Sequence, residues 1–345
     1  MLSRRIGWSL WLLGPLAVLG IVLLAVGVGS VAIPPLTVLR VLWAQFPFAR
    51  VAADWPEAYQ SIVMQIRLPR VLLVALTGAS LATSGAAYQG LFHNPLADPY
   101  LIGVASGAGL GAVAAISFEW QRSQLGVASI PVAAFCSALL TVSLVYALGR
   151  VGRSAPTTTL ILAGVAVGAL ATAISTYIIM SVSNQPARVL SFLLGGYGGA
   201  GWDSVAAITP FALVGSLVLW LYARPLNVLL FDEDQARQLG IDVERVKIIL
   251  IATATLCTAA AVSFSGLIGF VGLIVPHALR LVIGPDHRRL LPLSWLAGAG
   301  FLMLADLAAR TVIAPQELPL GVVTAFVGAP FFIYLLRRAK HAAFY

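Results

Sequence analysis

Long stretches without a charged side chain constrain this sequence more than any other feature. Residues 6–39 form a run of 34 residues that contains no Asp, Glu, Lys or Arg. A helix that crosses a bilayer needs about 20 mostly apolar residues, whereas the apolar core of a secretory signal has only about 7–15. No clear cleavage site follows the run. We therefore expect it to contain a retained first membrane helix.

Similar stretches recur along the chain, in which 60% of the residues are apolar and only 10% are charged. A soluble domain carries about 25% charged residues, so most of this chain must face lipid or other apolar helices. The pattern predicts an all-α membrane protein with about ten transmembrane helices. The expected segments are 10–30, 71–91, 99–118, 129–149, 158–180, 204–222, 247–263, 266–282, 291–309 and 318–336.

The basic residues predict an orientation. They flank the apolar segments instead of forming one patch, which argues against nucleic acid as a partner despite the net charge of +8. An even number of crossings places both termini on one side, and that side holds fourteen of the 21 Lys and Arg residues. Cytoplasmic loops carry the excess of Lys and Arg. We therefore expect both termini in the cytoplasm, in a multi-pass protein of the inner (cytoplasmic) membrane.

The whole chain, 1–345, is expected to form one transmembrane domain with a weak internal repeat, roughly 65–200 and 245–338. The stretches "TSGAAYQGLFHNP" and "FSGLIGFVGLIVPH" both place a Ser-Gly before a glycine-rich helix end and a polar proline turn. Internal repeats of this kind are common in transporters. In addition, "RVLSFLLGGYGGA", residues 188–200, predicts a short interfacial or re-entrant helix.

The eighth segment is interrupted. Ser265-Gly266 and Pro276 break its apolar run and predict two short or tilted pieces.

Ionisable residues inside the predicted helices are almost absent. Asp306 is the exception, and Arg310 follows one helical turn later. Asp306 can serve as a local ion-pair partner or as a proton or ion site, so an ion-coupled secondary transporter or a channel remains the alternative function. The only lysines, Lys247 and Lys340, follow no glycine-rich phosphate loop. The chain is therefore not expected to be an enzyme, and a separate ATPase must power any active transport.

One polar loop, residues 224–247, is suited to receive such a partner. Asp232 is a favourable N-cap, Gln235 completes a capping box, and Gly240 suits the left-handed residue after a helix. We expect a short helix over residues 233–239 on the cytoplasmic face. It is either a docking element or an ordinary surface helix.

The turn "GLFHNPLADPY", residues 90–100, is stiff and polar between two apolar segments. Pro95 and Pro99 fix their φ angles, and Asn94 can bond to the backbone locally. Four scattered histidines and two cysteines within apolar runs follow no metal-ligand spacing, so neither a metal site nor a cofactor is expected.

Four long motifs resemble the permease subunits of the iron-siderophore, haem and cobalamin ABC importers. They are "QIRLPRVLLVALTGASLATSGAAYQGLFHNPLADPYLIGVASGAGLGA", "LLFDEDQARQLGIDVERVK", "SFSGLIGFVGLIVPHALRLVIGPDHRRLLP" and "LADLAARTVIAPQELPLGVVTAFVGAPFFIYLL". The resemblance extends over essentially residues 60–338. The resemblance implies the type II ABC importer fold and a homodimer whose seam forms the pathway. It also implies two cytoplasmic ATPase subunits, an extracytoplasmic substrate-binding protein and contact with membrane lipid.

The resemblance also implies roles for individual residues. The cytoplasmic gate would comprise Asn94, Leu96, Thr157 and Thr158. The ATPase interface would comprise Asp232, Glu233, Gln235, Ala236, Arg237, Leu239, Gly240, His277 and Arg280. Docking of acidic groups on the binding protein would fall to Arg67, Arg70 and Arg310, because the guanidinium fork binds a carboxylate through two hydrogen bonds.

The cargo implied is a bulky metal chelate, and iron-siderophore, haem and cobalamin all remain open. Small-residue helices such as "YLIGVASGAGLGAVAA" have few polar groups with which to distinguish them. Iron-siderophore is placed first only because it is the largest class in the family.

Overall fold

The computed structural model describes residues 2–29, 31–46, 48, 54–122, 125–152, 155–231 and 233–343. Within these residues, six helices are long and apolar enough to cross a membrane. Three of them are single helices, namely α7 (Thr157–Ser181), α13 (Val243–Ser265) and α15 (His287–Thr311). The other three are composed of consecutive shorter elements. Glu57–Leu91 consists of α3 (Glu57–Ser61), η1 (Ile62–Arg67) and α4 (Leu68–Leu91), Gly126–Gly149 consists of η4 (Gly126–Ala128) and α6 (Ser129–Gly149), and Trp202–Leu221 consists of α9 (Trp202–Pro210), η5 (Phe211–Gly215) and α10 (Ser216–Leu221).

Four more helices contain shorter apolar stretches. They are α1 (Leu2–Gly27), α5 (Val104–Ser117), α14 (Val271–Ile283) and α16 (Leu320–Ala343). Each of the ten predicted segments overlaps one of these ten helices, and the prediction of an all-α membrane protein is confirmed. The remaining short elements are α2 (Pro35–Trp43), η2 (Pro99–Ile102), η3 (Trp120–Arg122), α8 (Pro186–Leu193), α11 (Ala223–Leu229) and α12 (Glu233–Gln238).

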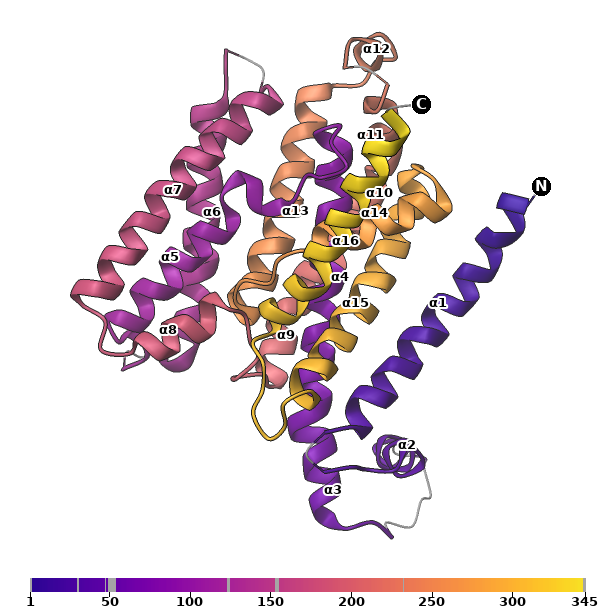
Figure 1. Cartoon of the computed structure of the whole chain (residues 1–345), viewed down its shortest axis with the longest axis vertical. Coiled ribbons are helices and arrows are strands. Elements are labelled where there is room, and N and C mark those ends of the chain that lie inside the picture. The colour runs from indigo at the N-terminus through magenta and orange to yellow at the C-terminus, as the bar shows by residue number, and fades with distance from the viewer. Residues whose placement is uncertain are drawn as a thin grey trace.

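Helix α4 lies at the centre of the bundle, between α13, α14 and α15 (Figure 1). Glycines allow these helices to touch backbone to backbone. A Cβ atom added at Gly78 of α4 would lie 2.2 Å from the carbonyl oxygen of Gly298 in α15, and one added at Gly85 would lie 1.8 Å from that of Gly272 in α14. Without a side chain at these positions, the helices reach the close separation that packing within a membrane requires.

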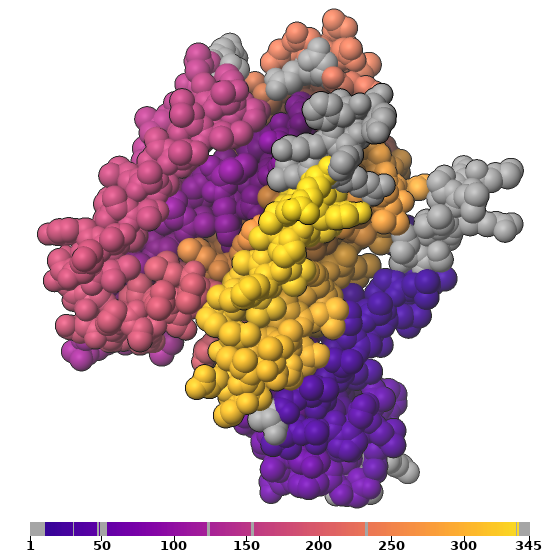
Figure 2. Space-filling model, in the orientation of Figure 1, coloured from indigo at the N-terminus to yellow at the C-terminus, as the bar shows by residue number. Residues whose placement is uncertain are grey.

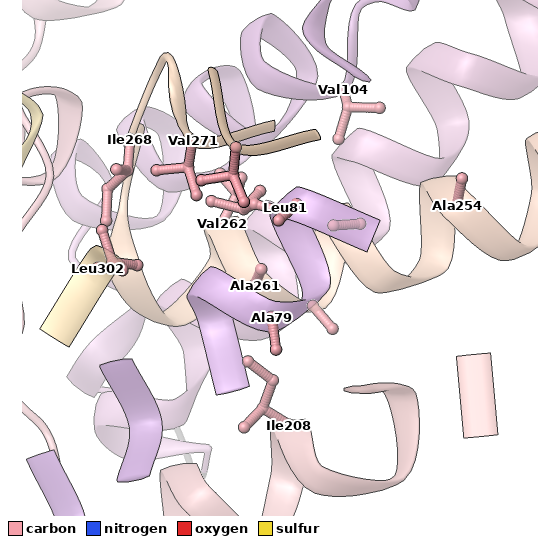
Figure 3. Close-up of a cluster of buried hydrophobic side chains, with 14 of the residues drawn as sticks. Ala79, Leu81, Val104, Ile208, Ala254, Ala261, Val262, Ile268, Val271 and Leu302 are labelled. Atoms are coloured by element: carbon pink, nitrogen blue, oxygen red, sulfur yellow. The ribbon is translucent and has the colours of Figure 1, made fainter. Parts of the chain in front are cut away.

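Small and branched apolar side chains fill the space around α4. Figure 3 shows part of this core, to which α4, α5, α9, α13, α14 and α15 all contribute. Ala79, Ile208 and Leu302 are completely buried there. The helices α5, α6 and α7 form a layer on one side of α4, whereas α1 packs against α15 on the other (Figure 1).

The chain unwinds where the sequence predicted a break. Helix α13 ends at Ser265, and α14 begins only at Val271. The loop after α8 hydrogen-bonds to this unwound stretch, with Gly196 N–H donating to the carbonyl of Ser265 at 2.8 Å and Leu267 N–H to that of Phe192 at 3.2 Å. Irregular backbone is tolerated at membrane depth only where protein groups satisfy it, and these loops satisfy each other.

The second expected break is wrong, because α14 continues through Pro276. A proline lacks the N–H that would bond to the carbonyl four residues earlier, which here belongs to Gly272. The amide of Gln89 in α4 donates to the carbonyls of Gly272 and Leu273 at 3.4 and 3.2 Å. A side chain from a neighbouring helix therefore replaces the missing bond.

The bundle has two distinct ends. The first turns of α1 and the last turns of α16 lie toward the same end as α12, whereas α2 and α3 lie at the opposite end (Figure 1). We refer to these as the α12 end and the α2 end.

Candidate docking and gating sites

The turn after α4 has a defined local geometry. His93 adopts a left-handed conformation with φ of +50°. Asn94 Oδ1 accepts a hydrogen bond from the N–H of Leu96 at 2.9 Å, and its carbonyl accepts one from Ala97 at 3.0 Å. The side chains of Asn94 and Leu96, the predicted gate residues, are both exposed. The Asn94 side chain thus stabilises the turn through a local hydrogen bond to the backbone, as the sequence predicted.

The second half of the turn is bonded to the unwound stretch before α14. Asp98 Oδ1 caps η2 by accepting from the N–H of Tyr100 at 2.8 Å. The Tyr100 hydroxyl donates to the carbonyl of Ile268 at 3.0 Å. Burial raises the pKa of Asp98 to about 6, although the hydrogen bond from Tyr100 acts in the opposite direction.

His93 connects this turn to α11, the element that precedes α12. Its Nε2 atom hydrogen-bonds to the carbonyl of Leu229, the last residue of α11. Helix α12 begins four residues later. The His93 side chain therefore links the predicted gate turn to the last residue of α11, which precedes the predicted ATPase-facing helix. Sequence reasoning did not single out this residue.

Helix α12 spans Glu233–Gln238, close to the predicted 233–239. It ends in a Schellman motif, in which Gly240 has φ of +81° and donates to the carbonyl of Arg237, while Ile241 N–H donates to that of Ala236. The C-terminal cap is therefore as predicted. Asp232, the predicted N-cap, lies outside the described residues, as does the side chain of Glu233.

The faces of α12 differ from the expectation in one respect. Ala236 is completely buried, so its side chain anchors the helix to the bundle and does not reach a partner. This corrects its predicted role. Gln235, Arg237, Leu239 and Gly240 are exposed, and Leu239 is an apolar residue that is 71% exposed. Arg237 pairs with Asp234 at 2.8 Å.

His277 and Arg280, also predicted to face the ATPase, are half-buried on α14. The His277 ring packs edge-on against Phe331 of α16, with 6.2 Å between ring centroids. Nearby α11 is fixed to the start of α15 by a residue that the sequence did not reveal. Asn227 donates to Asp286 Oδ1 at 2.7 Å and accepts from the N–H of His287 at 2.9 Å.

The other two predicted gate residues begin α7. Thr157 is half-buried and Thr158 is exposed, whereas the next residue, Thr159, donates to the carbonyls of Gly149 and Pro156. Within the described part of the chain, no hydrogen bond joins Thr157 or Thr158 to the turn that carries Asn94.

The three predicted docking arginines lie together at the α2 end, but two of them bind groups within the chain. Arg67 is only 6% exposed. It donates to the carbonyls of Val26 and Gly27 at 2.8 and 3.0 Å and to that of Val31 at 2.5 Å. A cation at the C-terminus of α1 satisfies carbonyls that have no helical partner. Arg67 is thus a cap of α1, which corrects its predicted docking role.

Arg310 has a similar position. Its Nη2 atom donates to the carbonyl of Ala25 at 3.1 Å, and its Nε lies 2.9 Å from Asp306 Oδ2. The Asp306 carboxylate is 2% exposed and also accepts from Arg70. Both Asp306 oxygens are therefore engaged by arginines, as in the ion-pair interpretation of this residue.

Arg70 differs from the other two because its partners include an exposed group. Its Nη2 atom donates to Asp306 Oδ1 at 2.9 Å, and its Nη1 and Nη2 atoms donate to Glu317 Oε1 and Oε2 at 3.0 and 2.8 Å. Glu317 lies in the loop between α15 and α16, and its side chain is 52% exposed. This pairing joins residues 247 positions apart, so the sequence offered no signal for it.

Among the described residues, no three His, Cys, Asp or Glu side chains gather closely enough to hold a metal ion.

Several known proteins are similar to this chain in sequence. The chain is 50% identical over 282 residues to the cobalamin import system permease protein BtuC of Halobacterium salinarum, covering 82% of this chain and 75% of the relative. It is 42% identical over 295 residues to the vitamin B12 import system permease protein BtuC of Escherichia coli, covering 83% and 87%. The uncharacterized ABC transporter permease protein YvrB of Bacillus subtilis is 44% identical over 318 residues, covering 92% and 90%.

Solved structures share the fold. A metal-chelate type ABC transporter in an inward-facing conformation matches with a TM-score of 0.82 and 28% identity, covering 97% of this chain and 99% of the other. Residues 16–338 match the FecCD transport family. The resemblance inferred from the four motifs is confirmed, and the chain, a multi-pass membrane protein, belongs to the FecCD transport family.

Proposed function

We propose that this chain is the membrane-spanning subunit of an ATP-driven importer whose cargo is cobalamin. The observation that carries the proposal is the 50% identity over 282 residues to a cobalamin import permease, combined with a second such relative at 42%. The preference for iron-siderophore rested on class size alone. These relatives favour a corrinoid instead, and ferric siderophore and haem become the alternatives in the test.

In this proposal the α12 end faces the cytoplasm, as the excess of Lys and Arg indicates. The exposed residues of α12 then meet the ATPase, with Leu239 as the apolar contact and Arg237 as the charged one. Closure of two ATPase subunits on ATP binding would displace α12. Through α11 and the hydrogen bond from His93 to Leu229, that displacement reaches the turn that carries Asn94 and Leu96.

The opposite end then faces the binding protein. Two copies of the chain form the pathway along their seam, with the faces of α7 and α16 toward it. Most of α7 is exposed in the single chain, and Figure 2 shows the surface hollowed between α16 and the layer of α5–α7. The second half of the gate, Thr157 and Thr158, would meet its partners only across the seam.

An ion-coupled carrier would need a carboxylate that is available to a proton or cation. Asp306 is the buried candidate, but two arginines occupy its oxygens. We therefore assign it a structural role and do not propose ion coupling.

The test is ATP-dependent uptake in proteoliposomes. The chain would be reconstituted with candidate ATPase and binding-protein partners, and each binding protein would be loaded in turn with cobalamin, ferric siderophore and haem. We expect uptake of cobalamin that requires ATP and both partners. Uptake of another chelate would overturn the cargo, and uptake without ATP would overturn the importer assignment.

A further inference from the structure

Two carboxylates share the guanidinium of Arg70, and they are not equivalent. Asp306 projects from α15, is almost completely buried, and also pairs with Arg310. Glu317 lies in the loop that follows α15 and is half exposed. Asp306 is therefore a fixed partner that orients Arg70, whereas Glu317 lies on the solvent side of the same guanidinium.

Glu317 binds in the geometry that a docked carboxylate would adopt. Its two oxygens accept from Nη1 and Nη2 of Arg70 at 3.0 and 2.8 Å, which is the bidentate arrangement typical of arginine and carboxylate. An acidic side chain from another protein could not form the same pair while Glu317 remains there.

The backbone that follows Glu317 is held independently of this pair. Leu318 N–H donates to the carbonyl of Ala309 at 2.9 Å, and Leu320 N–H donates to that of Gly195 at 3.0 Å. Release of Arg70 therefore requires only that the Glu317 side chain rotate, with no rearrangement of the loop. Partly exposed ion pairs are weak, so this release costs little.

We infer that docking exchanges carboxylates at Arg70: in the undocked permease Glu317 occupies the guanidinium, and an acidic side chain of the substrate-binding protein replaces it. This inference rests on the proposed function. Because Asp306 keeps Arg70 oriented throughout, the incoming carboxylate meets an ordered fork. Of the three arginines in this cluster, Arg70 alone takes part in the exchange.

The experiment compares docking to nanodisc-embedded permease–ATPase complexes, using the binding protein that supports uptake in the assay above. Glu317→Gln and Glu317→Ala should both bind it about three- to tenfold more tightly than wild type, because the competing carboxylate is gone. Glu57→Gln is the matched control. It removes one negative charge from an exposed position at the same end and should leave the affinity unchanged.

Arg70→Gln should weaken docking, and the double variant Arg70→Gln/Glu317→Gln should show no gain over it. If Arg70→Gln weakens docking but the Glu317 variants bind equally or more weakly than wild type, the exchange is wrong and the docking role stands. If Arg70→Gln has no effect, the docking role itself is wrong.

A second measurement needs no partner. Phenylglyoxal modifies accessible guanidinium groups, so Arg70 should react several times faster in Glu317→Ala than in wild type, with the exposed Arg188 as an internal reference. Equal rates at Arg70 would show that Glu317 does not shield it and would overturn the inference.

Discussion

At the scale of single residues, His93 combines a left-handed backbone with a hydrogen bond from its ring to another element. Left-handed backbone is uncommon for a residue other than glycine, although His and Asn adopt it more often than most. Such a conformation persists only where the surroundings fix it. Here the hydrogen bond from the His93 ring to Leu229 supplies that restraint.

This geometry allows the hydrogen bond from His93 to Leu229 of α11 to be removed while the left-handed turn is kept. Asn at position 93 tolerates left-handed backbone but is too short to reach Leu229, whereas Gln can still donate to that carbonyl. In the proposed importer, we expect His93→Asn to lower the ratio of cargo transported to ATP hydrolysed about five- to tenfold, the size of a typical coupling energy. His93→Gln should keep most of the wild-type ratio. Equal ratios in wild type and His93→Asn would show that the bond transmits nothing.

Asp98 predicts a dependence of stability on pH. Its pKa is raised to about 6 by burial, so its ionised form is disfavoured in the folded protein. The stability linked to this group is complete below about pH 4, the ordinary pKa of Asp, and is lost as the pH rises through about 6.

Asp98→Asn removes the ionisation but keeps an acceptor for the Tyr100 N–H. Above about pH 6 the variant should be more stable than wild type by up to about 2–3 kcal/mol, and below about pH 4 the two should agree. Melting temperatures of the detergent-solubilised proteins between pH 4 and 8 measure this difference. A constant difference across the range would mean that Asp98 does not titrate as described.

At the scale of helices, the contact between α4 and α15 depends on glycine. A methyl group at Gly78 would lie 2.2 Å from the carbonyl oxygen of Gly298, so the two helices would have to separate. We expect Gly78→Ala to destabilise the protein by about 1–3 kcal/mol. Thermal unfolding of Gly20→Ala, where nothing lies within 4 Å of the added atom, provides the control. A Gly78→Ala protein as stable as wild type would show that the helices can move apart freely.

Helices and their local caps could be predicted from the sequence, because their signals lie within a few residues. Gly240 ends α12 as expected, and the break after Ser265 occurs where the glycines follow. Contacts between distant segments could not be predicted. Arg67 resembles a surface arginine in sequence, but its carbonyl partners come from α1, about forty residues earlier. Pro276 similarly lies within a helix whose freed carbonyl bonds to Gln89, a residue 183 positions earlier in the chain.

At the scale of the whole molecule, the proposed seam makes a prediction about neighbouring copies. Leu162 in the second turn of α7 and Leu148 in the last turn of α6 are 69% and 62% exposed, and the two helices pack against each other. With Cys136 and Cys257 replaced by Ala, Leu162→Cys should form a covalent dimer with a short bifunctional thiol reagent. Leu148→Cys should not, since we place it against lipid. Equal cross-linking of the two would place the seam elsewhere.

Glu57–Leu91 is one continuous helical segment of 35 residues. At 1.5 Å per residue it is about 52 Å long, well beyond the ~30 Å hydrocarbon core. Arg70 is the fourteenth residue of this segment, and the turn that carries His93 and Asn94 follows directly after its last residue. In the proposed importer, a movement that docking causes at Arg70 can therefore reach that turn along one continuous helical segment, without passing from helix to helix.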